Sequence, residues 1–468
     1  MQAHDARFDG CFFIAVSSTG IYCRPVCRVK APKRENCTFY ASAALAEAAG
    51  YRPCLRCRPE LAPGNASVDA GARIAHQAAT LIENGALTDL GMDGIARRTG
   101  VTTRHLRRVF QTEFGVTPIG FAQTQRLLLA KRLLTDTALP MAVVAFSAGY
   151  NSLRRFNASF QERYRLTPEQ LRKARVDSTV DALTLDLGYR PPYDWDTLIG
   201  FLGARAIGGV EAVDSSAYRR TVQIVQRGRA HNGWIEIRRP DHRRSLMRVV
   251  ASASLAQVVP AVLARVKHLM DLSCSPVQIG EALGHRPGLR VPGAFDGFEI
   301  AVRAILGQQV SVAAARTLAC RIAHAFGTPV ETPYEGLCRA FPTAGAIADL
   351  DVQRLAQLGV LPSRARTILA LARMLAEGSI HLEPGVNVAA TIDRLQSIAG
   401  IGEWTAQYIA MRALAWPDAF PHTDLGVMKA LQEKNPRRVL EAGEAWRPWR
   451  AYAVMHLWTS EVSHGSVR

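Results

Sequence analysis

The sequence lacks any run of apolar residues long enough to cross a bilayer, and its N-terminus lacks the charged, apolar and small-residue pattern of a secretory signal. We therefore expect a cytoplasmic protein that does not insert into membranes. No cysteine follows Cys338, which excludes a thiolate-bound iron–sulfur cluster from the remainder of the chain.

Acidic residues are too few to balance the basic ones. The 468 residues include 57 Lys and Arg but only 40 Asp and Glu, a formal net charge of +17. Residues 1–176 carry 25 basic and 13 acidic side chains, a net of +12, whereas the rest carry 32 and 27, a net of +5. This excess favours a polyanion over a small acidic metabolite as partner. The length allows about three domains.

Six of the nine cysteines lie within the first 57 residues, where a reducing compartment favours metal or thiol chemistry over disulfides. Three residues separate Cys23 from Cys27, and two separate Cys54 from Cys57. Each pair can grip one ion, and four thiolates form the tetrahedral set that Zn²⁺ accepts. The spacing predicts a zinc module over residues 1–62. On spacing alone its metal is structural, because so small a segment cannot build its own core.

A repeat about fifty residues apart predicts two helix-turn-helix units over residues 70–176. Ala96-x3-Gly100-Val-Thr-Thr103 recurs as Ala145-x3-Gly149-Tyr-Asn-Ser152, and a basic amphipathic segment follows each copy. A glycine turn and a hydroxyl cap before a basic helix suit a helix that lies in a DNA major groove. A helical pattern over 119–135 joins the units. The candidate DNA contacts, some of which can equally face solvent, are Arg104, His105, Arg107, Arg108, Arg154 and Arg155.

Residues 180–272 switch to a two-residue hydrophobic period. The pattern predicts strands over 183–187, 218–226, 234–238 and 246–253, with helices over 195–206 and 255–270. We expect an antiparallel-sheet subdomain without chemistry of its own, followed by a helical domain over 273–468. The predicted fold class is therefore multidomain and mainly α with α+β parts.

The stretch from Ser397 to Gly426 carries the clearest site signal in the helical domain. Apolar residues recur at helical spacing on both sides of Gly400-Ile-Gly402, as in two short helices joined by a tight hairpin. The glycines allow backbone N–H groups to grip a phosphate. Asp424 follows in a turn, where a helix-cap aspartate is the reading that sequence physics favours. Three aromatic residues, one of them later in the chain, are candidates for a binding pocket and can equally be core residues: Trp404, Tyr408 and Trp458.

The cysteine motifs resemble those of the N-terminal domain of the Ada family. They read Ser18-Thr-Gly-Ile-Tyr-Cys-Arg-Pro-x-Cys27 and Gly50-Tyr-Arg-Pro-Cys-x-Arg-Cys-Arg-Pro59. The resemblance implies that Cys23 takes a methyl group from a DNA methylphosphotriester and that Cys27, Cys54 and Cys57 are the other zinc ligands. Methylation of one sulfur removes a negative charge, so affinity for DNA should rise. Arg24 and Arg28 are among the basic residues expected to contact phosphate.

The repeated helix-turn-helix units resemble the DNA-binding domain of AraC-type regulators, which also follows the zinc module in Ada. The resemblance implies sequence-specific binding to promoter DNA and regulation of transcription. The Pro-Cys-His-Arg acceptor motif of Ada's other methyltransferase domain is missing here. We therefore do not expect repair of O6-methylguanine.

The hairpin and the acid after it resemble the signature of base-excision DNA glycosylases of the AlkA type. The matching residues are Gly400-Ile-Gly402-Glu-Trp404-Thr-Ala-Gln-Tyr408 and Phe420-Pro-x-x-Asp424-Leu-Gly. The resemblance implies that Asp424 faces the sugar of a flipped-out nucleotide and that Trp404, Tyr408 and Trp458 line the base pocket. It also implies release of alkylated purines such as 3-methyladenine. Glycosylases that nick the backbone carry a lysine where this chain has Glu403-Trp404, so we expect a monofunctional enzyme.

A polar pair in the turn after Gly307 also resembles AlkA. Gln308 and Gln309 stand between two apolar helical patterns, so we expect the turn to face DNA. In AlkA-type enzymes a leucine there fills the gap left by the flipped base, and Gln309 occupies the matching position. A glutamine can fill the gap by hydrogen bonding to the orphaned base.

Three functional interpretations remain open on the sequence. We favour a monomer that repairs alkylated double-stranded DNA and regulates the alkylation response, with a zinc-thiolate methyl acceptor as its sensor. One alternative is a transcriptional regulator whose glycosylase part only binds DNA. The other is a plain enzyme whose N-terminal half tethers it to DNA.

Overall fold

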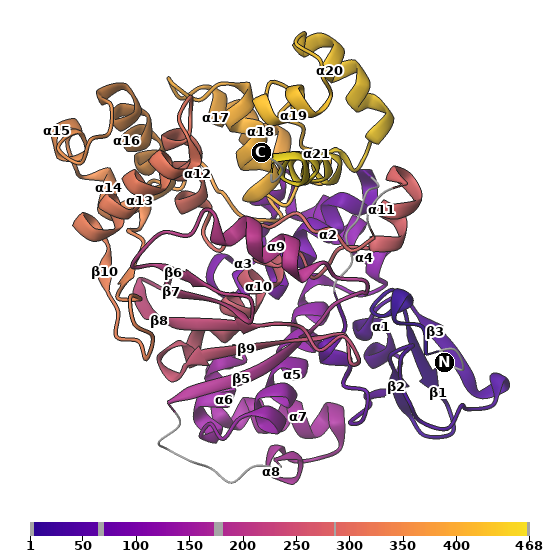
Figure 1. Ribbon diagram of the computed structural model, residues 1–468. Coiled ribbons are helices and arrows are strands. Elements are labelled where there is room, and N and C mark those ends of the chain that lie inside the picture. The colour runs from indigo at the N-terminus through magenta and orange to yellow at the C-terminus, as the bar shows by residue number, and fades with distance from the viewer. Residues whose placement is uncertain (1–3, 64–69, 173–180, 285–286, 466–468) are drawn as a thin grey trace.

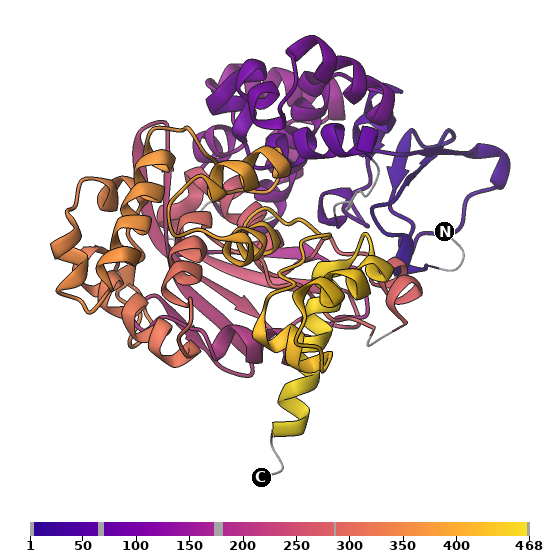
Figure 2. The ribbon, with the colours of Figure 1, turned by 90° about the horizontal axis from the view of Figure 1, so that it is seen from above.

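The computed structural model describes residues 4–63, 70–172, 181–284 and 287–465 (Figure 1). It confirms the predicted multidomain class, in which helices dominate and are accompanied by a four-stranded, a five-stranded and a small two-stranded sheet. Seen from above, the N-terminal helices lie on one side of the larger sheet and helix α21 (Arg450–Gly465) lies on the other (Figure 2). Within the described residues no helix is both long and apolar enough to span a membrane.

The N-terminal module is built on a small four-stranded sheet of order β3-β1-β2-β4. Strand β1 (Phe13–Val16) pairs antiparallel with β2 (Ile21–Cys23) and β3 (Cys37–Tyr40), while β4 (Arg52–Pro53) runs parallel to β2. Because β2 and β4 are neighbours, the cysteines at their ends come together. Helix α1 (Ala43–Ala48) begins at Ser42, whose side chain accepts a hydrogen bond from the Leu45 N–H.

The next seven helices form the two predicted helix-turn-helix units. Thr102 and Ser152 cap the second helix of each unit, which places a basic helix directly after each glycine turn. The long helix predicted between the units is α5, one residue longer at each end. The helices are α2 (Ala70–Glu83), α3 (Ala86–Thr99), α4 (Thr103–Phe114), α5 (Pro118–Asp136), α6 (Met141–Ser147), α7 (Leu153–Tyr164) and α8 (Pro168–Leu171).

The second sheet is antiparallel throughout and has the order β5-β9-β8-β7-β6. Strand β6 was not predicted because its three residues are too few to show a period. Strand β8 starts five residues earlier than predicted, in a polar stretch that pairs with β7. The elements are β5 (Ala182–Gly188), α9 (Trp195–Gly203), β6 (Glu211–Val213), β7 (Ala217–Gln226), β8 (Arg229–Arg238), β9 (Leu246–Ser252) and α10 (Val259–Leu269).

This sheet shares one apolar core with the second helix-turn-helix unit. Buried Phe156 and Phe160 of α7 belong to the same cluster as Leu185 of β5 and Ile235 of β8. The first unit has a separate core, which contains Phe110 and Phe114. The second unit is therefore packed into the body of the molecule, whereas the first is attached to it.

The remaining helices form the C-terminal domain around the largest apolar core. Helix α17 and helix α18 flank the predicted hairpin, and α19 begins directly after Asp424. The elements are α11 (Pro276–Leu283), α12 (Gly297–Leu306), α13 (Val312–Phe326), β10 (Thr328–Pro329), β11 (Arg339–Ala340), α14 (Ala344–Ala348), α15 (Val352–Ala356), α16 (Pro362–Ala376), α17 (Val388–Gln396), α18 (Glu403–Arg412), α19 (Leu425–Ala430), α20 (Pro436–Gly443) and α21.

Helix α5 connects three parts of the chain through buried polar contacts. The Lys131 ammonium lies 2.6 Å from a Glu60 carboxylate oxygen, and Arg58 lies 2.5 Å from Asp136, so two ion pairs join α5 to the zinc module. Arg132 donates to the main-chain carbonyl of Asp186 in the second sheet. Both side chains of the Glu60–Lys131 pair are almost fully buried, so loss of either would leave an uncompensated charge.

Glu47 is a second buried link between the zinc module and the helix-turn-helix region. Its carboxylate accepts hydrogen bonds from the hydroxyls of Tyr22 (3.0 Å) and Thr124 (3.1 Å), and its main-chain carbonyl accepts one from Arg163 (2.7 Å). Burial outweighs the attraction of Arg163 and raises the pKa of Glu47 from 4.5 to about 7.

The raised pKa of Glu47 predicts a pH dependence of stability. The folded protein binds this proton more tightly than the unfolded chain, so the stabilisation present below pH 4.5 is lost as pH rises to 7. Glu47→Gln should remove this loss. The free energy of unfolding of the variant, relative to that of wild type, should therefore increase between pH 5 and 8 by an amount on the order of 3 kcal/mol. Its melting temperature should rise relative to wild type over the same range. A difference in melting temperature between Glu47→Gln and wild type that stays constant from pH 5 to 8 would show that Glu47 is charged throughout this range.

Candidate active site and zinc centre

The hairpin between α17 and α18 uses its two glycines differently. Gly400 has φ +94°, and a Cβ there would lie 2.2 Å from the Thr367 hydroxyl, which itself donates to the Ala399 carbonyl (2.8 Å). Gly402 has φ −88° and is extended, and a Cβ there would meet nothing within 4 Å. Gly400 is therefore required by backbone conformation and packing, whereas Gly402 leaves an open approach to the backbone that begins α18.

The Gln308–Gln309 turn meets this hairpin. The Gln308 amide donates to the Gly400 carbonyl and to the Thr405 hydroxyl, both at 2.9 Å, and Arg364 donates to the Gln308 carbonyl. Gln308 therefore braces the hairpin from the side. Gln309 follows with φ +55° and an exposed side chain, next to exposed Val310. The two glutamines of the turn thus have different surroundings, one internal and one outward.

The Asp424 carboxylate accepts four hydrogen bonds. One oxygen, Oδ1, accepts from the main-chain N–H groups of Gly426 (2.9 Å) and Val427 (3.1 Å) and from the Trp458 indole (2.9 Å). The other, Oδ2, accepts from the Trp404 indole at 2.8 Å. Asp424 is thus the N-cap of α19, as sequence physics favoured, and also the meeting point of two indoles. An ionised carboxylate satisfies all four donors, because it is purely an acceptor.

Aromatic rings from three helices form a row beside Asp424. Trp404 stacks on Tyr408 with ring centres 5.4 Å apart, and Tyr408 lies 6.2 Å from Trp458. The structure therefore brings together the three aromatic residues that the resemblance placed in one pocket. Phe201 of α9 extends the row, since it stacks on Trp458 at 6.0 Å and 15°. Phe201 was missed because it lies about two hundred residues away in a subdomain without a chemical motif.

Two arginines contact the row, Arg412 fully buried and Arg205 half-buried. Arg412 donates to the Tyr408 hydroxyl at 2.8 Å and is anchored by the carbonyls of Pro292 and Gly293. Arg205 lies 3.7 Å from the centre of the Phe201 ring. These contacts hold Tyr408 and Phe201 in place within the row. Cation–π contact with Arg205 also anchors the ring that α9 contributes.

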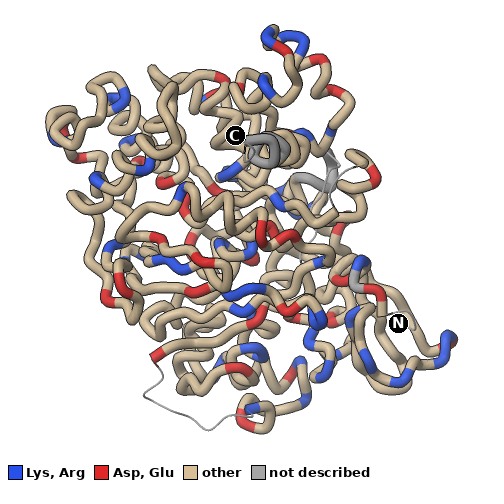
Figure 3. The backbone as a smooth tube through the Cα atoms, viewed as in Figure 1, with Lys and Arg blue, Asp and Glu red and all other residues tan. Residues whose placement is uncertain are grey.

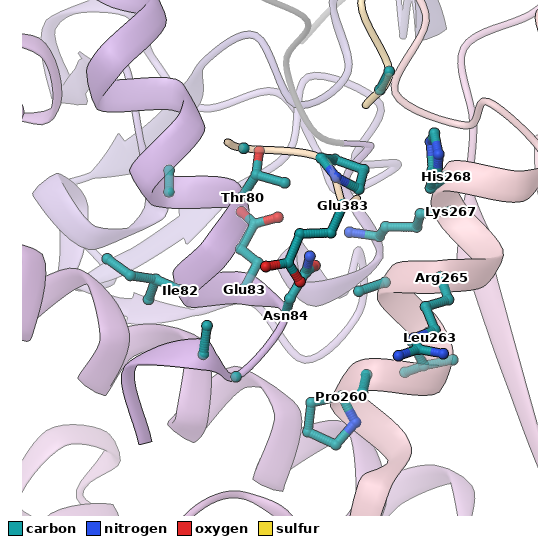
Figure 4. Close-up of a pocket in the computed structure, with 18 of the residues that line it drawn as sticks. Thr80, Ile82, Glu83, Asn84, Pro260, Leu263, Arg265, Lys267, His268 and Glu383 are labelled. Carbon is teal, nitrogen blue, oxygen red and sulfur yellow. The ribbon is translucent and has the colours of Figure 1, made fainter. Parts of the chain in front are cut away.

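A large cleft elsewhere in the molecule does not include this site. It has a volume of about 1820 Å³ and separates the first helix-turn-helix unit from the second sheet. Figure 4 shows Thr80, Glu83 and Asn84 on one wall and α10 side chains, among them Lys267, on the other. Asp424 and the aromatic row are not among its lining residues. Size alone therefore does not identify the site.

The four predicted zinc ligands come together at the edge of the small sheet. The sulfur atoms of Cys23, Cys27, Cys54 and Cys57 all lie within 4.8 Å of one another. A tetrahedral zinc site with Zn–S bonds of about 2.3 Å has sulfur atoms roughly 3.8 Å apart, so the donor set fits Zn²⁺. Main-chain N–H groups donate to two of the sulfurs, from Arg24 to Cys57 (3.3 Å) and from Arg56 to Cys54 (3.4 Å).

Arg24 lies where it was not expected. Its side chain is buried, forms an ion pair with Asp9 and donates to the Cys57 carbonyl at 3.1 Å. The predicted phosphate contact at this position is therefore wrong for this structure, because the guanidinium joins two segments of the zinc module. Arg28 is exposed, as a phosphate contact requires.

Most candidate residues of the helix-turn-helix units are exposed on the capped helices. Arg104, Arg107 and Arg108 lie on α4 and Arg154 and Arg155 on α7, all solvent-exposed. His105 is half-buried, and its Nδ1 lies 3.1 Å from an Arg108 nitrogen. Figure 3 shows that Lys and Arg occur on every module. The exposed positions are compatible with contacts to DNA.

Comparison with known families gives four matches in chain order. The models are the metal binding domain of Ada over residues 1–60, a helix-turn-helix domain over 95–174, the AlkA N-terminal domain over 184–296 and the HhH-GPD superfamily base excision DNA repair protein over 302–437. The first match agrees with the cysteine cluster and confirms zinc as the predicted cofactor.

Relatives resemble either the whole chain or parts of it. Over 98% of its length the chain is 38% identical to the "Probable bifunctional transcriptional activator/DNA repair enzyme AlkA" of Mycobacterium tuberculosis, 95% of which is covered. It is also 38% identical to "DNA-3-methyladenine glycosylase 2" of Escherichia coli, over 59% of this chain and 96% of that one. The "Bifunctional transcriptional activator/DNA repair enzyme Ada" of E. coli is 37% identical over 36% of this chain and 46% of its own length.

The two hairpin glycines predict different mutant behaviour. Gly400→Ala should lower the melting temperature, because a left-handed residue pressed on Thr367 costs about 1–3 kcal/mol. Gly402→Ala should melt like wild type but bind duplex DNA more weakly, since its methyl group obstructs the approach to the backbone. Thermal melting and dissociation constants for duplex DNA check both expectations. Gly345→Ala, at an exposed position of α14, is the control. Unchanged DNA binding by Gly402→Ala would show that this backbone does not contact DNA.

Proposed function

The chain belongs to the family of bifunctional transcriptional activator/DNA repair enzymes of the AlkA type, and from this premise we propose that it hydrolyses the N-glycosidic bond of alkylated purines in double-stranded DNA. The Asp424 carboxylate beside a row of aromatic rings is the observation that supports this proposal. The substrate class is a 3-methyladenine type of base.

Asp424 would act on the sugar. Breaking the bond between the base and the sugar carbon sends the bonding electrons to the base, so positive charge develops on the sugar and an alkylated base leaves neutral. A fixed carboxylate stabilises that charge and orients the water that adds to the sugar carbon and then loses a proton. The four donors hold the carboxylate in place before the reaction, so it need not reorganise.

The aromatic row would hold the flipped-out base. An alkylated purine carries positive charge, which favours the electron-rich faces of Trp404, Tyr408 and Trp458. The charge itself makes the base a good leaving group, which is consistent with a single acid in the site. Helix α18 begins with Glu403 and Trp404 and offers no lysine nucleophile there, so we propose a monofunctional glycosylase.

Gln309 would fill the space that the base vacates. It is the exposed member of the turn that Gln308 and Arg364 hold against the hairpin. Its amide can donate to and accept from the orphaned partner base. The hairpin glycines would grip the neighbouring phosphate.

The N-terminal half would sense methylated phosphate and bind promoter DNA. Bound zinc keeps the four cysteines as thiolates. Cys23 would be the methyl acceptor, as the resemblance of its motif to the Ada family implies, while the sulfurs of Cys54 and Cys57 accept main-chain N–H hydrogen bonds. Its sulfur would bond to the methyl carbon as the carbon–oxygen bond breaks and a phosphodiester anion leaves. Helices α4 and α7 would then contact the promoter.

Asp424→Asn tests the enzymatic proposal. The amide keeps the size of the side chain but removes its charge, so release of 3-methyladenine from alkylated duplex DNA should fall at least about 100-fold. Base release is measured by chromatography at equal protein concentrations, with thermal melting as a check of folding. Asp393→Asn, an exposed acid on α17, should behave like wild type. If wild type and Asp424→Asn release no base, the chain is a regulator whose C-terminal domain only binds DNA.

Methyl transfer to Cys23 predicts a specific modification. Zinc-loaded protein exposed to duplex DNA with methylphosphotriester linkages should gain one methyl group, located on Cys23 by peptide mass spectrometry. Cys11→Ser should still gain the group, because Cys11 is exposed and lies outside the cluster. Cys57 is the most accessible of the four ligands. A methyl group on Cys57, or none at all, would contradict the proposal.

A further inference from the structure

A second, small cavity lies where the first helix-turn-helix unit touches the glycosylase domain. Its volume is about 150 Å³. Arg97 and Arg98 at the end of α3 form one side, and His381 and Arg394 form the other. The rest of its lining is apolar or neutral, with no carboxylate among the described residues that line it. The cavity therefore concentrates basic groups from two different domains.

The two domains are joined directly beside this cavity. The Asn387 N–H donates to the Arg98 carbonyl at 2.9 Å, and the Gln77 amide donates to the Val386 carbonyl at 3.0 Å. The Arg98 guanidinium forms an ion pair with Glu383. Gly100 packs so closely on Asn387 that a Cβ would lie 2.5 Å from its amide nitrogen. The basic groups thus have a fixed relative position.

The positive charge in the cavity is only partly compensated. Glu383 already pairs with Arg98, and within the described part of the chain Arg97 has no acidic partner. Arg394 donates to the Ser379 carbonyl, which is neutral, and its side chain is exposed. Burial, together with the charges of Arg98 and Arg394, lowers the pKa of His381 to about 4. His381 is therefore neutral near pH 7 and can donate a hydrogen bond without adding charge.

The cavity lies along the helix that leads into the hairpin. Asn387, Thr391 and Arg394 follow one another at helical spacing along α17, and all three line the cavity. Helix α17 has nine residues and is roughly 14 Å long, and its C-terminal end leads into Ser397 and the hairpin. That length corresponds to roughly four base pairs of duplex, at about 3.4 Å each. The cavity residues on α17 therefore lie within about four base pairs of the hairpin, measured along a duplex.

We propose that this cavity, between Arg97 of the helix-turn-helix region and Arg394 of α17, binds a backbone phosphate of the DNA duplex held at the hairpin. The inference rests on the proposed DNA binding by the glycosylase domain and extends its footprint onto the regulatory domain. A phosphate bridging Arg97 and Arg394 fixes the two domains together on DNA. Damage recognition and the first helix-turn-helix unit thereby share one duplex.

The test is the double variant Arg97→Gln/Arg394→Gln in the full-length zinc-loaded protein. Its affinity for an alkylated duplex long enough to extend beyond the hairpin on both sides should fall about tenfold. The slope of log affinity against log salt should decrease by about 1, as expected for one lost phosphate contact. A short duplex that covers only the hairpin footprint should bind both proteins equally. Arg354→Gln/Arg438→Gln removes two exposed charges elsewhere in the same domain and should change neither quantity.

Two further measurements separate the possible failures. The double variant should release base from the short duplex as fast as wild type does. If wild type itself releases no base from this duplex, the proposed function is wrong, and the binding measurements still test the cavity. Inorganic phosphate at matched ionic strength should compete with the long duplex in wild type and less in the double variant. Unchanged affinity and salt slope on the long duplex would overturn the proposal. If phosphate binding alone depended on the two arginines, the cavity would hold a free anion and the DNA contact would be wrong.

Discussion

One hydrogen-bonded carboxylate, that of Asp424, joins the elements of the candidate active site. It caps α19 with one oxygen and joins the indoles of α18 and α21 through both. A cap aspartate and a catalytic aspartate are often weighed as alternatives, yet the donors that define the cap here would also hold the carboxylate for the proposed reaction. Main-chain and indole N–H groups hold the carboxylate at one fixed point beside a row of aromatic rings. A capping role therefore strengthens the enzymatic interpretation.

The modules are less separate than a sequence of four domains suggests. The second helix-turn-helix unit shares its apolar core with the second sheet, and α5 reaches the zinc module through the buried pairs Glu60–Lys131 and Arg58–Asp136. Buried ion pairs add specificity of position more reliably than stability. The zinc module and the second unit are thus held in one arrangement. The first unit has its own core and is joined to the glycosylase domain at Val386 and Asn387 and to the second sheet through Asp89 and Gln226.

Features that are local in the sequence could be predicted, and features that depend on distant partners could not. Each local feature can be recognised within about ten residues of sequence. These features are the two pairs of closely spaced cysteines, the capped helix after a glycine turn and the Gly-x-Gly hairpin. Arg24 looked like a phosphate contact because nothing near it in sequence indicates that Asp9 and Cys57 enclose it. The place of Phe201 in the aromatic row and the hydrogen bond from Gln308 to the hairpin were not predicted, for the same reason. Their partners, Trp458 and Gly400, lie far along the chain.

Gln309 shows how the fold positions a residue toward a ligand. A non-glycine residue at φ +55° is disfavoured by about 1 kcal/mol or more, because Cβ crowds the backbone. The cost is offset by its neighbours: Gln308 bonds to Gly400 and Thr405, and Arg364 holds the Gln308 carbonyl. The same contacts that force the strained turn also fix the hairpin, so a change in one alters the other. The exposed amide of Gln309 is therefore held next to the hairpin, where the proposed contact with an orphaned base would require it.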